Sequence, residues 1–171
     1  MKKIALITYK NNSDAYEALS KLKTLSNGTT LEIKQAAIVE KSMDQNNFSI
    51  KDGLDFESGN RIATGGLIGA IVGILGGPLG VLCGWVVGDI AGMGTNYVKT
   101  KRNNTIFDKV SQRLEPGEQG LLVYMDETNE ELVDIMLVDN LGGEIHRYSY
   151  QEVKEDIRHA TDCLNDEAAT K

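Results

Sequence analysis

The alternation of apolar and polar residues predicts short strands and amphipathic helices on both sides of one long apolar run. Ile4–Tyr9 is apolar on both faces and rich in β-forming residues, which is typical of a central strand. Leu31–Val39 alternates and predicts a second strand. Between these strands, apolar residues at helical spacing predict a helix that ends at Asn27-Gly28: Ala15, Leu19, Leu22 and Leu25.

The same patterns recur near the C-terminus. Gly120–Met125 predicts a third strand and Ile145–Tyr150 a fourth. Between them, Thr128-x-x-Glu131 has the spacing of a capping box, and Gly142-Gly143 ends the helix that it opens. We also expect a hairpin that turns at Asp52-Gly53, a short helix before the EPG sequence, and a final helix with one apolar face: Val153, Ile157, Ala160 and Leu164.

This order of elements predicts the fold class. Without residues 57–115 the chain has the order βαβ followed by βαβ, which suits an α+β, ferredoxin-like sandwich with helices on one face of a four-stranded sheet. We therefore expect residues 1–60 and 103–171 to form one α/β domain. Residues 61–102 would be an insertion within it.

The insertion contains 27 consecutive residues without charge, from Ile62 to Gly88. Such a run exceeds what a buried core helix needs and favours contact with a membrane. Its glycines form two series at four-residue spacing, and this spacing aligns them along one helix face. The two series are Gly65, Gly69, Gly73 and Gly77, then Gly80, Gly84, Gly88 and Gly92.

The spacing predicts two helices, at 62–76 and 78–97, folded into a hairpin with Pro78 at its turn. Glycine is unfavourable inside a helix by about 0.5–1 kcal/mol relative to alanine. Close packing of helix backbones compensates for that cost, so we expect a glycine-zipper interface and a homo-oligomer. A phosphate-binding loop is disfavoured, because the chain contains neither GxGxxG nor GxxxxGK[ST].

Charge supports the same interpretation. The net charge of −7 disfavours nucleic acid as a partner. Basic residues bracket the apolar run and place the α/β domain on the cytoplasmic side of a membrane: Arg61, Lys99, Lys101 and Arg102. The first arm is short for a full span, and Asp89 would be costly at mid-bilayer, so partial penetration or assembly around Asp89 is expected.

Chemical signals are weak. Cys83 and Cys163 form no CxxC pair, which favours a reducing, cytosolic setting. His159 and Cys163 have the spacing of two metal ligands on a helix face, but two ligands make an incomplete site. Glu144, His146, Tyr148 and Tyr150 share one strand face, a pattern more typical of packing. No nucleophile has a local base, so we expect no enzyme and no cofactor.

The βαβ start, the glycine-zipper hairpin interrupted by GGPLG, and the sequences LEPGEQGLLVYMDE and GGEIHRYSYQE resemble the bacterial domain-of-unknown-function family 1269, described as predicted membrane proteins. The zipper after βαβ is also similar to general stress proteins of the 17M-like group. These resemblances imply membrane association and a stress role, and they supply no catalytic residues.

Together these observations favour a non-enzymatic, membrane-associated protein that self-associates through its zipper hairpin and scaffolds or perturbs a membrane. The alternative is a soluble, cytoplasmic, oligomeric ligand-binding or regulatory module with the hairpin buried between subunits. An enzyme that uses the sheet surface ranks third.

Overall fold

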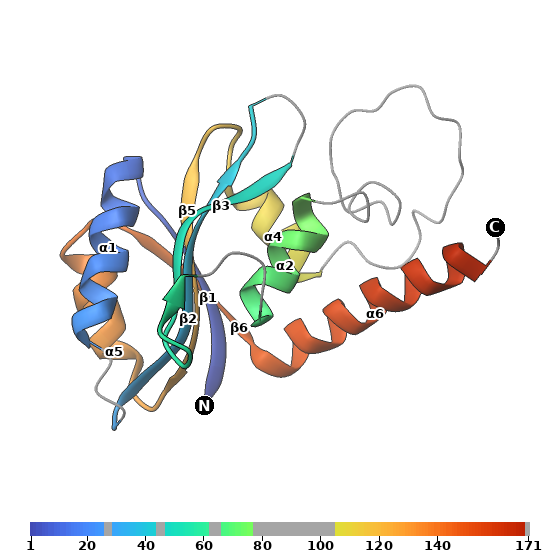
Figure 1. Cartoon of the computed structure of the whole chain (residues 1–171). Coiled ribbons are helices and arrows are strands. Elements are labelled where there is room, and N and C mark those ends of the chain that lie inside the picture. Colours follow the sequence, from blue (N-terminus) through green and yellow to red (C-terminus); the bar gives the residue numbers. More distant parts are fainter. Residues whose placement is uncertain (26–28, 44–46, 62–65, 77–104, 170–171) are drawn as a thin grey trace.

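The protein is a mixed α+β structure built around one antiparallel sheet (Figure 1). The computed structural model describes residues 1–25, 29–43, 47–61, 66–76 and 105–169. Its sheet has the order β4-β3-β2-β5-β1-β6. The strands are β1 (Lys2–Thr8), β2 (Leu31–Lys41), β3 (Phe48–Asp55), β4 (Asn60–Arg61), β5 (Gln119–Glu127) and β6 (Glu144–Ser149).

The first strand is central, as its pattern predicted. β1 pairs with β5 on one side and with β6 on the other. Its side chains alternate between the two faces of the sheet, and Ile4, Ala5, Leu6 and Ile7 are all fully buried. Both faces of the sheet must therefore be covered.

Helices cover both faces, so the prediction of helices on one face only is wrong. Figure 1 shows α1 and α5 on one side of the sheet and α2, α4 and α6 on the other. The apolar alternation of β1, β2 and β5 on both faces requires this second layer. The helices are α1 (Asn12–Leu25), α2 (Gly66–Gly76), α4 (Ile106–Arg113), α5 (Glu130–Val133) and α6 (Tyr150–Ala169), and α5 continues into the π-helical segment η1 (Asp134–Asp139).

Helix α2 lies within the predicted insertion but shares the core of the sandwich. Its buried residues pack in one cluster with β1, β2, β3, α4 and α6. They are Ile68, Ile71, Val72, Ile74 and Leu75. The first part of the expected hairpin, predicted at 62–76, is thus a short helix on the sheet surface.

Close contacts fix both ends of α2. Gly66 has φ +73°, and a Cβ there would collide with the side chain of Gln35 on β2. At the other end, a Cβ on Gly76 would collide with the backbone carbonyl of Phe48 on β3. Glycine is required at these two positions because the helix ends approach the sheet closely.

The hairpin predicted at Asp52-Gly53 turns elsewhere. Both residues lie inside β3, where a Cβ on Gly53 would come within 2.9 Å of the Ala36 carbonyl oxygen. Gly53 therefore permits close approach of β2 and β3. The chain turns at 56–59 instead, where the Asp55 carboxylate accepts hydrogen bonds from the backbone N–H groups of Glu57 and Ser58.

The predicted capping box at Thr128 and Glu131 is also wrong. Asn129 caps α5, because its side chain accepts a hydrogen bond of 2.9 Å from the N–H of Glu131. The Thr128 hydroxyl donates to the Thr30 carbonyl instead. The end at Gly142-Gly143 is confirmed, with Gly142 at φ +68° and its N–H bonded to the Val138 carbonyl.

A buried carboxylate joins the sheet to the layer of α1 and α5. The Glu127 side chain is fully buried and accepts a hydrogen bond of 2.8 Å from Nε of Arg147, with Nζ of Lys3 at 3.3 Å. Arg147 also reaches Asp134 at 2.8 Å. This network holds Arg147 on the face of β6 that is opposite α4.

Candidate functional site

The glycine series places its two described members in different surroundings. Gly69 is buried, whereas Gly73 is exposed. The outward face of α2 carries the exposed Gly73 and the partly buried Ala70, and Leu67 and Gly76 at its margins are partly buried. Among the described residues, a Cβ on Gly73 would meet no heavy atom within 4 Å. The outward face of α2 is thus apolar and almost without side chains.

Most of the other predicted site residues lie outside the described ranges, so their predicted roles stay predictions. The backbone of Arg61 lies in β4. The remaining ones outside the description are Gly65, Gly77, Gly80, Gly84, Gly88, Gly92, Pro78, Asp89, Lys99, Lys101 and Arg102. Within the described residues, no helix is long and apolar enough to cross a membrane.

The weak metal candidates lie on the last helix. His159 and Cys163 are partly buried on α6, and the Cys163 thiol is free. Within the part of the chain that the structure describes, no group of three or more metal-ligating side chains comes together. The described surroundings of His159 and Cys163 provide no third ligand.

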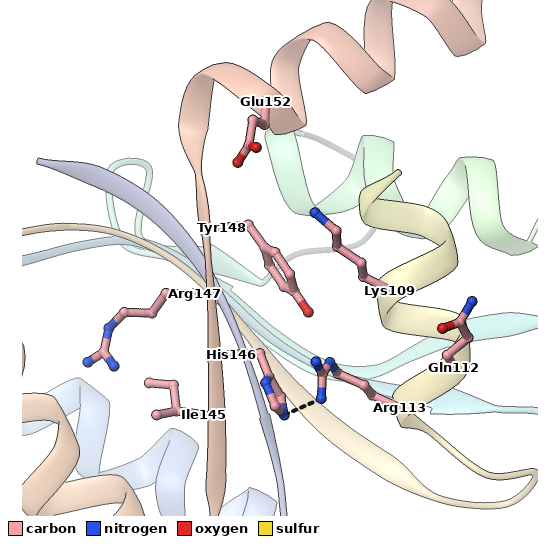
Figure 2. Close-up of a pocket in the computed structure, with 8 residues that line it drawn as sticks. All are labelled: Lys109, Gln112, Arg113, Ile145, His146, Arg147, Tyr148 and Glu152. Carbon is pink, nitrogen blue, oxygen red and sulfur yellow. Dashed lines mark hydrogen bonds between the residues drawn. The ribbon is translucent and has the colours of Figure 1, made fainter. Parts of the chain in front are cut away.

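A hollow of about 640 Å³ lies between α4, β6 and the first turn of α6 (Figure 2). Its volume is within the usual range for small-molecule sites, roughly 300–1,000 Å³. The residues that line it are Lys109, Gln112, Arg113, Ile145, His146, Arg147, Tyr148 and Glu152. We call it the α4–β6 pocket.

Strand alternation decides which of these side chains face α4. Figure 2 shows His146 and Tyr148 pointing toward α4, whereas Ile145 and Arg147 point to the other side of β6. Lys109 and Arg113 are four residues apart, so they lie on the same face of α4. This face is turned toward β6. The pocket therefore brings together two cationic groups, an imidazole and a phenol.

Local capping fixes α4 in this position. Thr105 and Asp108 form a reciprocal capping box at its first turn. Asp156 of α6 also accepts a hydrogen bond of 2.8 Å from the N–H of Ile106. At the other end, the buried Nζ of Lys41 donates to the Ser111 carbonyl at 2.9 Å. Both ends of the helix that carries Lys109 and Arg113 are thus anchored.

Tyr148 is the buried polar group of the pocket. The residue is 9% exposed, and its hydroxyl has no hydrogen-bond partner among the described residues. Figure 2 shows this hydroxyl pointing toward the gap between His146 and Arg113. Burial raises the pKa of Tyr148 above its ordinary value, against a smaller opposing effect of Arg113, so the phenol keeps its proton. The pocket therefore contains an unused hydrogen-bond donor.

His146 is contacted by two groups at the same ring atom. Its Nε2 lies 2.7 Å from an Nη1 of Arg113 and 2.9 Å from a carboxylate oxygen of Glu144. Burial and then the positive charge of Arg113 lower the pKa of His146 below its usual value, although Glu144 opposes them. The imidazole is therefore neutral at neutral pH, and its Nε2 either donates or accepts but cannot do both.

Tyr150, two residues after the pocket residue Tyr148, packs against another tyrosine. The rings of Tyr124 and Tyr150 stack with centroids 5.5 Å apart. Tyr150 begins α6 rather than ending β6, so it leaves the face on which the sequence pattern placed it with His146 and Tyr148. Of the four residues expected on one strand face, only the first three stay on the strand.

Sequence reasoning noticed His146 and Tyr148 but interpreted them as packing, and it missed Lys109 and Arg113. The signal that was present is the spacing of two basic residues on the polar side of the helix at 106–113. The sequence does not show that this helix packs beside β6, because no local pattern encodes that contact.

Comparison with protein-family models, curated proteins and solved structures finds no match to this chain. The resemblance to bacterial domain-of-unknown-function family 1269 therefore stays a prediction.

Proposed function

We propose that this chain is a non-enzymatic, membrane-associated protein that forms homo-oligomers through the glycine face of α2 and the apolar segment that follows it. The observation that carries the proposal is the outward face of α2. Ala70 and Gly73 lie there, away from the buried isoleucine, valine and leucine side chains of the same helix. Small residues on an exposed apolar helix favour close contact with another helix.

The packing of α2 restricts where lipid contact begins. Because its larger side chains are part of the sandwich core, α2 stays on the sheet. In this proposal, lipid contact begins beyond Gly76, in the uncharged residues 77–88. Lys99, Lys101 and Arg102 then meet anionic headgroups on the cytoplasmic side, at about 1 kcal/mol each. The stress role implied by the family resemblance is part of the same proposal.

We propose a ferredoxin-like sandwich made of β1, β2, β5 and β6. Their order in the sheet, β2-β5-β1-β6, supports it, as do α1 and α5 on the same face. Strands β3 and β4 then extend this sheet beside β2.

The experiment is a mass measurement of the full chain with and without vesicles that contain anionic lipid. We expect an oligomer, and co-flotation with the vesicles. Gly73→Leu projects a large side chain into open space and should reduce the assembly to a smaller species with the fold intact. Ser20→Leu, at an exposed position of α1, is the matched control and should leave the mass unchanged. A monomeric wild type, or an unchanged assembly of Gly73→Leu, would refute self-association through this face.

The second candidate is a soluble oligomeric ligand-binding or regulatory module, and the α4–β6 pocket favours it. In that case the protein stays in the supernatant without detergent at every salt concentration. Co-sedimentation with anionic vesicles that is lost at high salt would exclude this candidate.

A further inference from the structure

We propose that the α4–β6 pocket binds a small molecule that bears a phosphate monoester, with Lys109, Arg113, His146 and Tyr148 as the groups that hold the phosphate. This inference goes beyond the proposed function and does not depend on whether the chain contacts lipid. It depends on three observations. They are the hydrogen-bond donors that line the pocket, the contacts that these groups make when no ligand is bound, and the volume of the pocket.

The donors line the same pocket, with Arg113 and His146 in contact at one end and Lys109 over the Tyr148 ring. Arg113 presents a planar fork of N–H groups that matches two phosphate oxygens, and Lys109 adds a second positive charge. The Tyr148 hydroxyl adds a neutral donor that has no partner and points toward Arg113 and His146 (Figure 2). A buried hydroxyl without a partner is costly, and a ligand oxygen would satisfy it. Nζ of Lys109 lies over the Tyr148 ring, and the Arg113 side chain ends near the hydroxyl (Figure 2).

The contacts without a ligand leave one interaction unfavourable. If Nε2 of His146 carries the proton, it donates to Glu144 but faces the N–H groups of Arg113. If Nε2 is bare, it accepts from Arg113 but faces the Glu144 carboxylate. A phosphate oxygen placed between Arg113 and His146, with Arg113 moved away from Nε2, removes this conflict, because the oxygen accepts from Arg113 and from protonated Nε2 together.

Glu144 is positioned to be displaced. Its side chain is 72% exposed, and its carboxylate lies 4.0 Å from Nη1 of Arg113, too long for a hydrogen bond. The carboxylate that lines the pocket itself, Glu152, lies at the far end, near the start of α6, where it accepts a hydrogen bond from the N–H of Ser149 (Figure 2). Glu144 is thus the acidic side chain that competes with an incoming anion.

The volume selects an ester over free phosphate. About 640 Å³ is far more than one phosphate ion fills. The remaining room is bounded by the Tyr148 ring, over which Nζ of Lys109 lies 5.6 Å from the centroid, and by the amide of Gln112. These groups suit a compact, partly polar substituent on the phosphate.

The test is calorimetric titration of the full chain with AMP, glycerol 3-phosphate and inorganic phosphate. We expect saturable binding, with both esters tighter than inorganic phosphate. Arg113→Gln should raise the dissociation constant roughly tenfold or more, since it removes a charged hydrogen-bond pair. Tyr148→Phe should raise it roughly threefold to tenfold. Arg158→Gln, at an exposed position of α6 outside the pocket, is the control and should change nothing.

Two measurements distinguish a binding role from a structural one. Tyr148→Phe removes an unpaired buried hydroxyl, so it should unfold at the same temperature as the wild type or higher while it binds more weakly. Glu144→Gln should tighten binding, because it removes the competing carboxylate. If Arg113→Gln fails to fold, Lys109→Gln takes its place in the comparison. Absence of binding by all three probes, or binding unaffected by these variants, would overturn the proposal.

A vesicle arm separates the two sources of a phosphate monoester. Binding to vesicles that contain phosphatidic acid, competed by AMP and weakened by Tyr148→Phe, assigns the pocket to a lipid headgroup. Vesicle binding that AMP does not compete assigns it to a soluble ester, provided that AMP itself binds. In both cases phosphatidylcholine vesicles, which lack a monoester, should not compete with AMP.

Discussion

The side-chain oxygen of Gln35 accepts a hydrogen bond of 3.1 Å from the backbone N–H of Ile68 and so joins β2 to the first turn of α2. The amide nitrogen of the same side chain donates to Asp55 on β3 at 3.3 Å. Gln35 is 6% exposed. One buried amide therefore links two strands to the helix that carries the exposed glycines.

Replacement of Gln35 by leucine should destabilise the protein. The N–H of Ile68 at the helix start would lose its acceptor, and an unsatisfied buried donor costs about 1–3 kcal/mol. Urea unfolding followed by circular dichroism measures this loss. Glu32→Gln, at an exposed position of the same strand, is the control and should leave the midpoint unchanged. Equal midpoints for Gln35→Leu and the wild type would contradict the role of Gln35.

Two glycines of α2 should respond to alanine in opposite directions. Gly66→Ala forces a positive φ on a residue with a Cβ and creates a collision with Gln35, so it should destabilise by at least about 1–2 kcal/mol. Gly73→Ala places a methyl group in open space within the helix and should stabilise by about 0.5–1 kcal/mol. Thermal unfolding of the two variants checks both signs. A stable Gly66→Ala variant would mean that the first turn of α2 differs from the one described.

Arg147→Met should be strongly destabilising. It leaves the fully buried Glu127 carboxylate with only Lys3 as a charged partner among the described residues, and breaking a buried pair costs on the order of 3 kcal/mol. Arg158→Met on α6 removes an exposed arginine and should have little effect. The measurement is the free energy of unfolding in urea at pH 7. A similar loss of unfolding free energy in both variants would show that the contacts of Arg147 with Glu127 do not stabilise the fold.

The stability of the fold should fall as the pH falls below the ordinary histidine pKa of about 6.5. Burial and Arg113 lower the pKa of His146 in the folded state, so the unfolded chain binds the proton more tightly. The contribution of His146 is therefore fully present above pH 6.5 and is lost as the pH decreases toward the lowered folded pKa. Unfolding free energies of the wild type and His146→Gln between pH 7.5 and 5.5 provide the test, and the variant should show the shallower decline.

Removal of residues 77–104 should leave the fold intact, whereas removal of helix α2 with them should unfold the protein. Because α2 and α4 pack in the same core layer, replacement of 77–104 by a flexible linker of about ten residues should preserve cooperative unfolding. Replacement of 66–104 should abolish it, since Phe48 and the sheet face beneath α2 would lose their cover. Loss of the fold in both variants would mean that 77–104 is itself part of the core.

The sequence patterns located the strands well because burial repeats along each of them. β1, β2, β5 and β6 lie within a few residues of their predicted positions, and Gly142 ends its helix as expected. Periodicity also identified Ile68, Ile71 and Leu75 as part of an apolar helix. It could not tell that these side chains pack on the sheet, since an apolar helix has the same pattern in a core as in a membrane.

The errors share a physical cause. Gly53 permits close approach of two strands rather than a turn, and Asn129 caps α5 because Thr128 bonds to Thr30. Each outcome is decided by a neighbour that is distant in sequence. The α4–β6 pocket was missed for the same reason, because Arg113 and His146 are 33 residues apart.

The order of the sheet has a consequence for synthesis on the ribosome. β1 and β2 both pair with β5, which is translated only after the apolar run from Ile62 to Gly88. Translation proceeds at about 5–20 residues per second. The apolar run of the nascent chain is therefore exposed for some seconds before the central strands can pair. A chaperone or a bilayer that captures the run competes with sheet closure in this interval. The run is thus accessible to such a partner before the central sheet has formed.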